Sequence, residues 1–120
     1  MNNLIDILDL TESEIDALID TANDIIKNPD NYAEKCKRKK LATLFFEPST
    51  RTRLSFEAAM LELGGSVLGF SEAASSSASK GESVGDTVKV VSCYADIIAM
   101  RHPKEGAPMV AAQKASIPVI

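Results

Sequence analysis

The order of apolar and polar residues predicts a long helix near the start of the chain. Apolar side chains recur every three or four positions from Ile15 to Ile26, which is the spacing of one helix face. Thr11 and Glu14 form a capping box in front of this segment, because the hydroxyl can cap the helix while the carboxylate reaches back. Asn28-Pro29-Asp30 is expected to end the helix.

Strand and helix patterns then alternate along the rest of the chain. Apolar runs predict strands at 41–46, 66–70, 96–100 and 117–120, and helical spacing predicts helices at 50–63, 84–91 and 108–115. This alternation is typical of an α/β fold, with a doubly wound parallel sheet that carries helices on both faces. We expect one such domain over residues 1–120, incomplete at its C-terminal end because the chain stops in an apolar strand.

Composition narrows the class of protein without identifying it. The chain has 120 residues, 45% hydrophobic and 25% charged, which is enough for one hydrophobic core and too little for two. A net charge of −4 argues against a general nucleic-acid binder. Apolar runs are short and the N-terminus lacks a basic n-region, so neither a membrane span nor a signal peptide is expected. We expect a cytoplasmic protein without nucleic-acid or membrane partners.

Two cysteines and one histidine offer little for metal binding. Cys36, Cys93 and His102 are far apart in sequence, whereas structural zinc needs four ligands, usually in close pairs, so we expect no metal site. Lone thiols are typical of a reducing compartment. Cys93 is expected to pack in or beside the core. Cys36 lies in a basic run at 35–40, which is either a solvated turn or a polyanion patch, and lysines there would make it the more reactive thiol.

Three polar segments, 47–53, 71–83 and 101–106, each follow a predicted strand. Ligands of parallel sheets bind beyond the carboxyl ends of the strands, so these segments are expected at one edge. In the first, hydroxyls and a guanidinium stand at a helix N-terminus, where unpaired backbone N–H groups attract anions. This segment is either a phosphate cradle or an ordinary N-cap with surface arginines.

The arginines of that first segment are expected to differ in role. Arg51 and Arg53 are two positions apart, so on a helix they point to different sides and cannot easily grip one phosphate. Glu57 lies four residues after Arg53, which predicts a structural ion pair.

Other charged residues leave alternatives open. Lys80 lies in a serine-rich loop that is either a solvated linker or a mobile lid. Arg101 directly follows a strand and is either a surface charge or an anion ligand. His102 is expected to be a hydrogen-bonded structural residue. Glu47 is either a surface acid or a clamp for a second domain.

One continuous run is highly specific: Phe45-Phe46-Glu47-Pro48-Ser49-Thr50-Arg51-Thr52-Arg53-Leu54-Ser55-Phe56-Glu57. It resembles the carbamoyl-phosphate signature of the aspartate/ornithine carbamoyltransferase family. The similarity covers essentially the whole chain, continuing through Leu63-Gly64-Gly65, Lys80-Gly81-Glu82-Ser83, Asp86-Thr87 and Met100-Arg101-His102-Pro103. The serine-rich loop ending in Lys80 and the Arg101-His102-Pro103 run resemble the aspartate branch more than the ornithine branch.

The resemblance implies a reaction. The amine of L-aspartate attacks the carbonyl carbon of carbamoyl phosphate, giving N-carbamoyl-L-aspartate and phosphate in pyrimidine biosynthesis. It implies no cofactor, no metal and no covalent intermediate, so catalysis would rest on positioning and electrostatics. The alternatives are an ornithine or related carbamoyltransferase, and a non-catalytic anion-binding module.

The family pattern also implies the site residues. In that pattern the phosphate is bound by Ser49, Thr50, Arg51 and Thr52. Thr52 and Arg101 also reach the carbonyl oxygen. Lys80 and Ser77, for which Ser76 is the alternative, are expected from a neighbouring subunit of a homotrimer. The residues expected to be catalytic are Arg51, Thr52, Lys80 and Arg101.

Part of the family pattern is not found in these residues. The His-Pro-x-Gln motif that completes the carbamoyl site, and the aspartate-binding domain that follows it, are not in the 120-residue sequence. We therefore expect this chain alone to be inactive. Regulatory chains are left open as partners.

Overall fold

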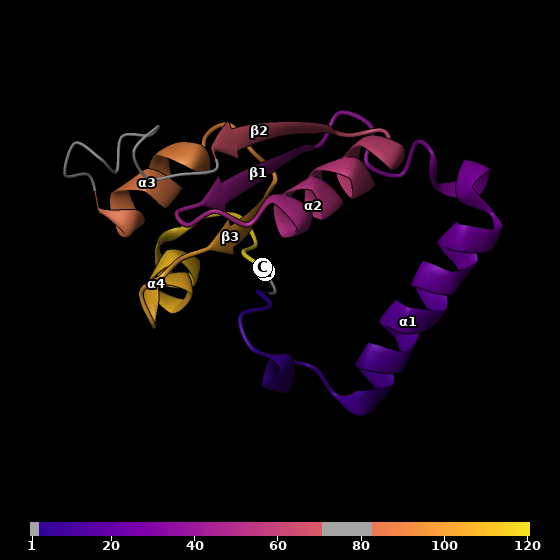
Figure 1. Cartoon of the computed structure of the whole chain (residues 1–120), viewed down its shortest axis with the longest axis horizontal. Coiled ribbons are helices and arrows are strands. Elements are labelled where there is room, and N and C mark those ends of the chain that lie inside the picture. Colours follow the sequence, from indigo (N-terminus) through magenta and orange to yellow (C-terminus); the bar gives the residue numbers. More distant parts are fainter. Residues whose placement is uncertain (1–2, 71–82) are drawn as a thin grey trace.

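The computed structural model describes residues 3–70 and 83–120 (Figure 1). Its helices are α1 (Glu12–Lys27), α2 (Thr50–Glu62), α3 (Val84–Val91) and α4 (Ala107–Lys114), with short 3-10 turns η1 (Ile7–Asp9) and η2 (Pro29–Tyr32). The strands are β1 (Lys40–Phe45), β2 (Ser66–Phe70) and β3 (Ile97–Arg101). Most of the serine-rich loop, including Ser76, Ser77 and Lys80, lies outside the described residues.

The three strands form a parallel sheet in the order β2-β1-β3. The strand expected at 117–120 is present only as an isolated parallel bridge between Ile98 and Val119. On the outer side, Val119 pairs with the N-terminal segment: its carbonyl accepts from the Leu4 N–H, and its N–H donates to Oδ1 of Asn3, both at 2.9 Å. On the inner side, the Ile98 N–H donates to the Pro118 carbonyl and the Ile120 N–H donates to the Ile98 carbonyl, but Pro118 has no N–H to donate in return.

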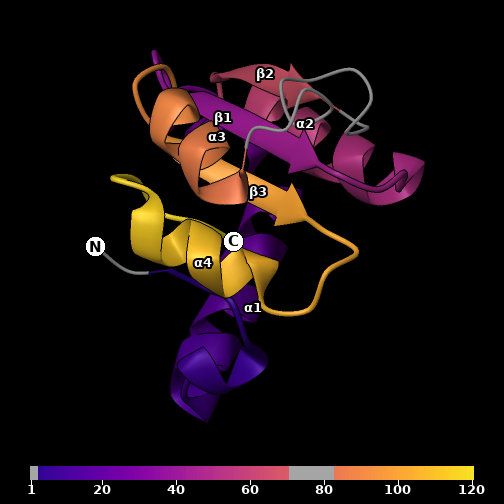
Figure 2. The ribbon, with the colours of Figure 1, turned by 90° about the vertical axis from the view of Figure 1, so that its left-hand side faces the viewer.

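Helices cover both faces of the sheet (Figures 1 and 2). Successive side chains of β1 point to opposite faces. Leu41 packs in one cluster with Met60 of α2, whereas Leu44 packs in the other with Val88 of α3 and Ala111 of α4. Strand β1 is buried from its second residue onward. The predicted α/β fold with helices on both faces of a parallel sheet is therefore confirmed.

The helix-end signals in the sequence are also confirmed. The Glu14 N–H donates to Oγ1 of Thr11 at 3.2 Å, and the Thr11 N–H donates to Oε1 of Glu14 at 3.1 Å, closing the capping box of α1. At the end of α2, the N–H groups of Gly64 and Gly65 donate to the carbonyls of Leu61 and Met60. Gly64 has φ +86°, a conformation that favours glycine at the end of a helix.

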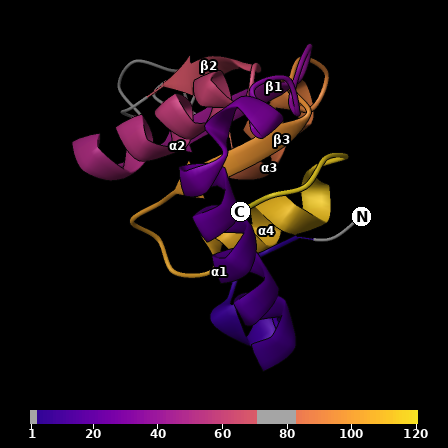
Figure 3. The ribbon, with the colours of Figure 1, turned by 90° about the vertical axis from the view of Figure 1, so that its right-hand side faces the viewer.

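Helix α1 stands apart from the sheet (Figures 1 and 3). Its apolar side chains follow the predicted spacing, yet Leu18, Ile19 and Ile26 are exposed. None of the helices in residues 3–70 and 83–120 is long and apolar enough to span a membrane. The hydrophobic core is consequently built by the sheet, α2, α3 and α4.

Candidate anion-binding site

The carboxyl ends of β1 and β3 bring two of the three predicted segments together. The arrowheads of these strands point to the same edge of the sheet (Figure 2). Phe45 is paired with Arg101 in the sheet, and the Phe46 N–H donates to the Arg101 carbonyl at 2.8 Å. Segments 47–53 and 101–106 therefore leave the sheet side by side, as expected for a parallel sheet.

Arg101 spans the gap between these two segments. Its Nε donates to Oε1 of Glu47 at 2.8 Å, and its Nη1 donates to Oγ of Ser49 at 3.2 Å. The Arg101 side chain is 48% exposed, so the guanidinium remains accessible from solvent. Glu47, whose role the sequence leaves open, is thus the ionic partner of Arg101 in this structure.

The first turn of α2 provides the positive end of a helix at the same edge. Ser49 is the N-cap residue, but it makes no side-chain cap bond, and its hydroxyl accepts from Arg101 instead. The first intrahelical bond runs from the Arg53 N–H to the Ser49 carbonyl at 3.0 Å, so the preceding amides have no intrahelical acceptor. No acidic residue occupies this turn, and Thr50, Arg51 and Thr52 are exposed. The arrangement favours an anion.

Arg53 has the structural role that its spacing predicts. Its Nη1 lies 3.2 Å from Oε2 of Glu57, which confirms the ion pair. The same carboxylate oxygen accepts from Oγ1 of Thr43 at 2.7 Å, and Thr43 is buried in β1. Glu57 therefore ties α2 to the sheet and Arg53 holds the Glu57 carboxylate in place, while Arg51 is exposed on the same turn.

His102 is hydrogen-bonded, as expected, and it also belongs to a group of rings that sequence reasoning missed. Its Nδ1 accepts from the Lys104 N–H at 2.9 Å, and its ring packs on Phe46 with centroids 4.7 Å apart. Burial and the nearby Lys104 ammonium lower the pKa of His102 below its usual value, while Glu47 opposes this shift. The neutral imidazole is thus favoured beside Arg101.

The burial of the two thiols is the reverse of what the sequence predicts, since Cys36 is the more buried one. Cys93 was expected beside the core, but helix α3 ends at Val91 and Cys93 is exposed in the turn that follows. Cys36 is half-buried and packs against the cluster formed with Leu41 and Met60. Both thiols are free. Even on a continued helix, Cys93 would lie about 140° around the axis from the buried Val88, so helical spacing favours an exposed thiol.

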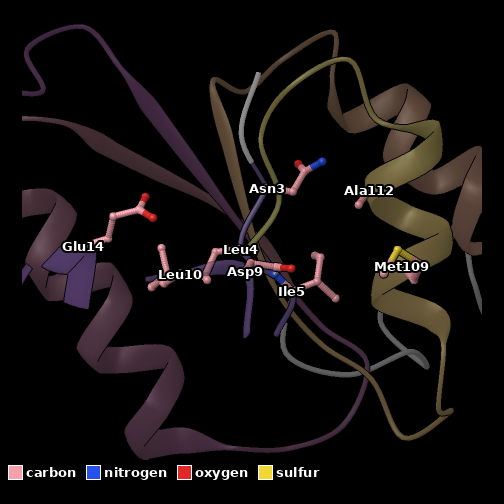
Figure 4. Close-up of a pocket in the computed structure, with 8 residues that line it drawn as sticks. All are labelled: Asn3, Leu4, Ile5, Asp9, Leu10, Glu14, Met109 and Ala112. Carbon is pink, nitrogen blue, oxygen red and sulfur yellow. Dashed lines mark hydrogen bonds between the residues drawn. The ribbon is translucent and has the colours of Figure 1, made fainter. Parts of the chain in front are cut away.

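A separate pocket lies between the N-terminal segment and α4 (Figure 4). The two carboxylates that line it accept hydrogen bonds from neighbouring backbone N–H groups. Oδ2 of Asp9 accepts from the N–H groups of Asp6 and Ile5, which lowers the pKa of Asp9, and Glu14 belongs to the α1 cap. Because both acids hold local backbone groups, we assign no ligand to this pocket.

The fold and the edge together define a class. A parallel α/β sheet whose carboxyl edge carries a helix N-terminus and accessible arginines is an anion-binding domain. The family model described as "Aspartate/ornithine carbamoyltransferase, carbamoyl-P binding domain" matches residues 2–120. The chain belongs to the aspartate/ornithine carbamoyltransferase family.

Individual relatives agree with this assignment. The chain is 67% identical over 120 residues to the aspartate carbamoyltransferase catalytic subunit of Lachnoclostridium phytofermentans, and it spans 39% of that protein. Among solved structures, it matches the catalytic subunit of M. jannaschii aspartate transcarbamoylase with a TM-score of 0.91 and 46% identity, covering 100% of this chain and 41% of the other. It matches the Trypanosoma cruzi enzyme in complex with carbamoyl aspartate and phosphate with a TM-score of 0.90 and 34% identity, covering 98% and 37%.

Proposed function

We propose that this chain supplies most of the carbamoyl-phosphate site of an aspartate carbamoyltransferase. The observation that carries the proposal is the convergence of Arg101, Ser49 and the first turn of α2 at one edge of the sheet. The names of the relatives support L-aspartate as the acceptor. The product would be N-carbamoyl-L-aspartate, an intermediate of pyrimidine biosynthesis.

The phosphate would be held by the start of α2. We assign it to the hydroxyls and amides of the first turn and to the guanidinium of Arg51, whose charge-assisted bonds to phosphate are strong. The contributing residues are Ser49, Thr50, Arg51 and Thr52. A phosphate bound here would face the positive end of the helix dipole as well.

Catalysis would then stabilise charge that develops during the transfer. A bond forms between the aspartate nitrogen and the carbonyl carbon, the carbon–oxygen bond to phosphate breaks, phosphate leaves with the bonding electrons and the amine loses a proton. Thr52 and Arg101 would donate to the carbonyl oxygen as it becomes negative. Arg101 carries five N–H donors, so its bonds to Glu47 and Ser49 leave others for substrate.

We further propose that the site is shared between subunits of a homotrimer. Lys80 and Ser77 would reach the site from the neighbouring chain. Support comes from α2, where Leu54 and Leu61 are exposed on a side of the helix other than that of the buried Met60. A helix that is apolar on more than one side is typically covered on each of them, and a second subunit would cover this stripe.

The remaining substrate contacts would lie in other parts of a longer protein. This chain spans about two-fifths of the relatives that it matches, and we place the aspartate-binding residues in the rest. We place the enzyme in the cytoplasm, a reducing compartment that suits two unpaired thiols.

The acceptor amine tests the proposed function. A chain of the relatives' full length that contains these 120 residues, called the full-length enzyme below, would be incubated with carbamoyl phosphate and either L-aspartate or L-ornithine. We expect carbamoylation of L-aspartate alone. Turnover of L-ornithine would assign the chain to the other branch, and phosphate binding without transfer to either amine would support a non-catalytic module.

A further inference from the structure

Three aromatic rings lie at the carboxyl ends of the three strands. Phe70 is the last residue of β2, Phe46 directly follows β1, and His102 directly follows β3. The Phe46 and Phe70 rings meet edge to face with centroids 5.0 Å apart, and the Phe46 and His102 rings lie 4.7 Å apart. The rings thus follow the strand order β2-β1-β3 and join the sheet edge that carries the site.

His102 has a second attachment, to the backbone that follows it. Its Nδ1 accepts from the Lys104 N–H at 2.9 Å, which closes a tight turn directly after Arg101. An imidazole nitrogen accepts only when it carries no proton, so the ring is neutral with its hydrogen on Nε2. Side-chain acceptors that bond a backbone N–H two residues on stabilise turns in the same way as Asn and Asp do.

Both attachments restrain Arg101. The Arg101 carbonyl accepts from the Phe46 N–H at 2.8 Å, and the ring of the next residue, His102, packs on the side chain of that same Phe46. Phe46 therefore holds both Arg101, through its backbone carbonyl, and His102, through its ring. This limits rotation of the backbone from which the Arg101 side chain extends toward Glu47 and Ser49.

We propose that His102 is a positioning residue of the carbamoyl-phosphate site, which fixes the direction of Arg101 through its ring contact with Phe46 and its bond to the Lys104 amide. This inference rests on the proposed function of Arg101. His102 itself need not touch substrate. A displacement of about 1 Å in a reacting group can cost about 10²-fold in rate, so a loosened Arg101 would lower activity while the fold persists.

The variants separate the two attachments. His102→Asn keeps an acceptor for the Lys104 N–H but removes the ring, His102→Phe keeps a ring but removes the acceptor, and His102→Ala removes both. Lys104→Ala is the matched control, because it removes the neighbouring charge and leaves the backbone N–H in place. We expect His102→Ala in the full-length enzyme to lower kcat/KM for carbamoyl phosphate by about 10- to 100-fold. His102→Asn and His102→Phe should each recover part of this loss, and Lys104→Ala should stay near wild type.

A double-mutant cycle with Arg101→Ala gives the decisive measurement. If His102 acts through Arg101, His102→Ala should cause little further loss of kcat/KM in the Arg101→Ala background. Equal losses in both backgrounds, or wild-type kcat/KM for His102→Ala, would overturn the positioning role. Wild-type activity of Arg101→Ala would instead overturn the proposed function. If His102→Ala fails to fold, the same double-mutant cycle with Arg101→Ala is measured with His102→Asn and His102→Phe.

Discussion

The Arg101 guanidinium donates from Nε to Oε1 of Glu47 at 2.8 Å, joining the last residue of β3 to a residue two positions after β1. A carboxylate at this place both orients the arginine and repels an arriving phosphate. Because Glu47 is about one-third exposed, solvent screens the repulsion and keeps it modest.

Glu47→Gln keeps an acceptor for Arg101 and removes the negative charge. We expect inorganic phosphate, measured as a competitive inhibitor against carbamoyl phosphate in the full-length enzyme, to bind up to about fivefold more tightly. Glu105→Gln removes an acid from the neighbouring loop and should leave phosphate affinity unchanged. Weaker phosphate binding in Glu47→Gln would mean that orientation of Arg101 by the full charge outweighs repulsion.

Arg51 and Arg53 should separate activity from stability. Arg51→Ala removes a phosphate contact and is expected to lower kcat by about 10²- to 10³-fold in the full-length enzyme, with little change in Tm. Arg53→Ala breaks the ion pair with Glu57, whose carboxylate also binds the buried Thr43, so it should lower Tm while turnover per folded molecule stays near wild type. A greater loss of turnover in Arg53→Ala would reverse the two roles.

Gly69 is expected to be intolerant of a side chain. It has φ +138° in β2, and a Cβ there would overlap the backbone carbonyl oxygen of Thr43 in the central strand. Gly69→Ala should therefore lower the free energy of unfolding by about 1–3 kcal/mol, measured by urea denaturation. Gly106→Ala is the control, since Gly106 also has a positive φ of +84° but open space around it. Equal losses in both variants would show that backbone conformation alone matters.

Local signals explain how much of this fold the sequence predicts. The capping box at Thr11, the glycines after α2 and the pairing of Arg53 with Glu57 each depend on residues within a few positions of one another. Such patterns do not depend on tertiary structure. The continuous apolar run of β1 is equally local, because a strand in the middle of a parallel sheet buries both faces.

Contacts between distant residues could not be predicted in the same way. The bond from Arg101 to Glu47 and the ring contact of His102 with Phe46 need the register of β1 against β3, which no periodicity in the sequence specifies. The outer pairing of Val119 with Asn3 joins opposite ends of the chain. The first two contacts set the arrangement of side chains at the carboxyl edge, and this arrangement could not be predicted from the sequence.

The lowered pKa of His102 predicts that the stability of the folded protein depends on pH. Its pKa in the folded protein lies below the usual 6.5, because burial and Lys104 outweigh Glu47. As pH falls below about 6.5, the unfolded state takes up the proton first, so the free energy of unfolding falls until the folded pKa is reached. His102→Asn should remove this part of the slope between pH 7.5 and 5.5. The carboxyls of Asp9 and Glu14, with pKa values lowered by hydrogen bonds, should contribute only at lower pH.

Lys80 provides the test of a site shared between subunits. Full-length Lys80→Ala and Arg51→Ala variants are each expected to be inactive. They would be dissociated, mixed in equal amounts and reassembled. In a trimer that contains both variants, one site combines the intact Arg51 of a Lys80→Ala chain with the intact Lys80 of its neighbour.

Random reassembly would leave three-quarters of the trimers mixed, with one intact site in three, so the mixture should recover about a quarter of wild-type activity. Each variant dissociated and reassembled by itself is the control, and it should stay inactive. If every chain used its own Lys80, each site in the mixture would carry one defect and no activity would return. That result would exclude the shared site, but it would leave the phosphate contacts proposed for residues 49–52 in place, because those contacts come from one chain.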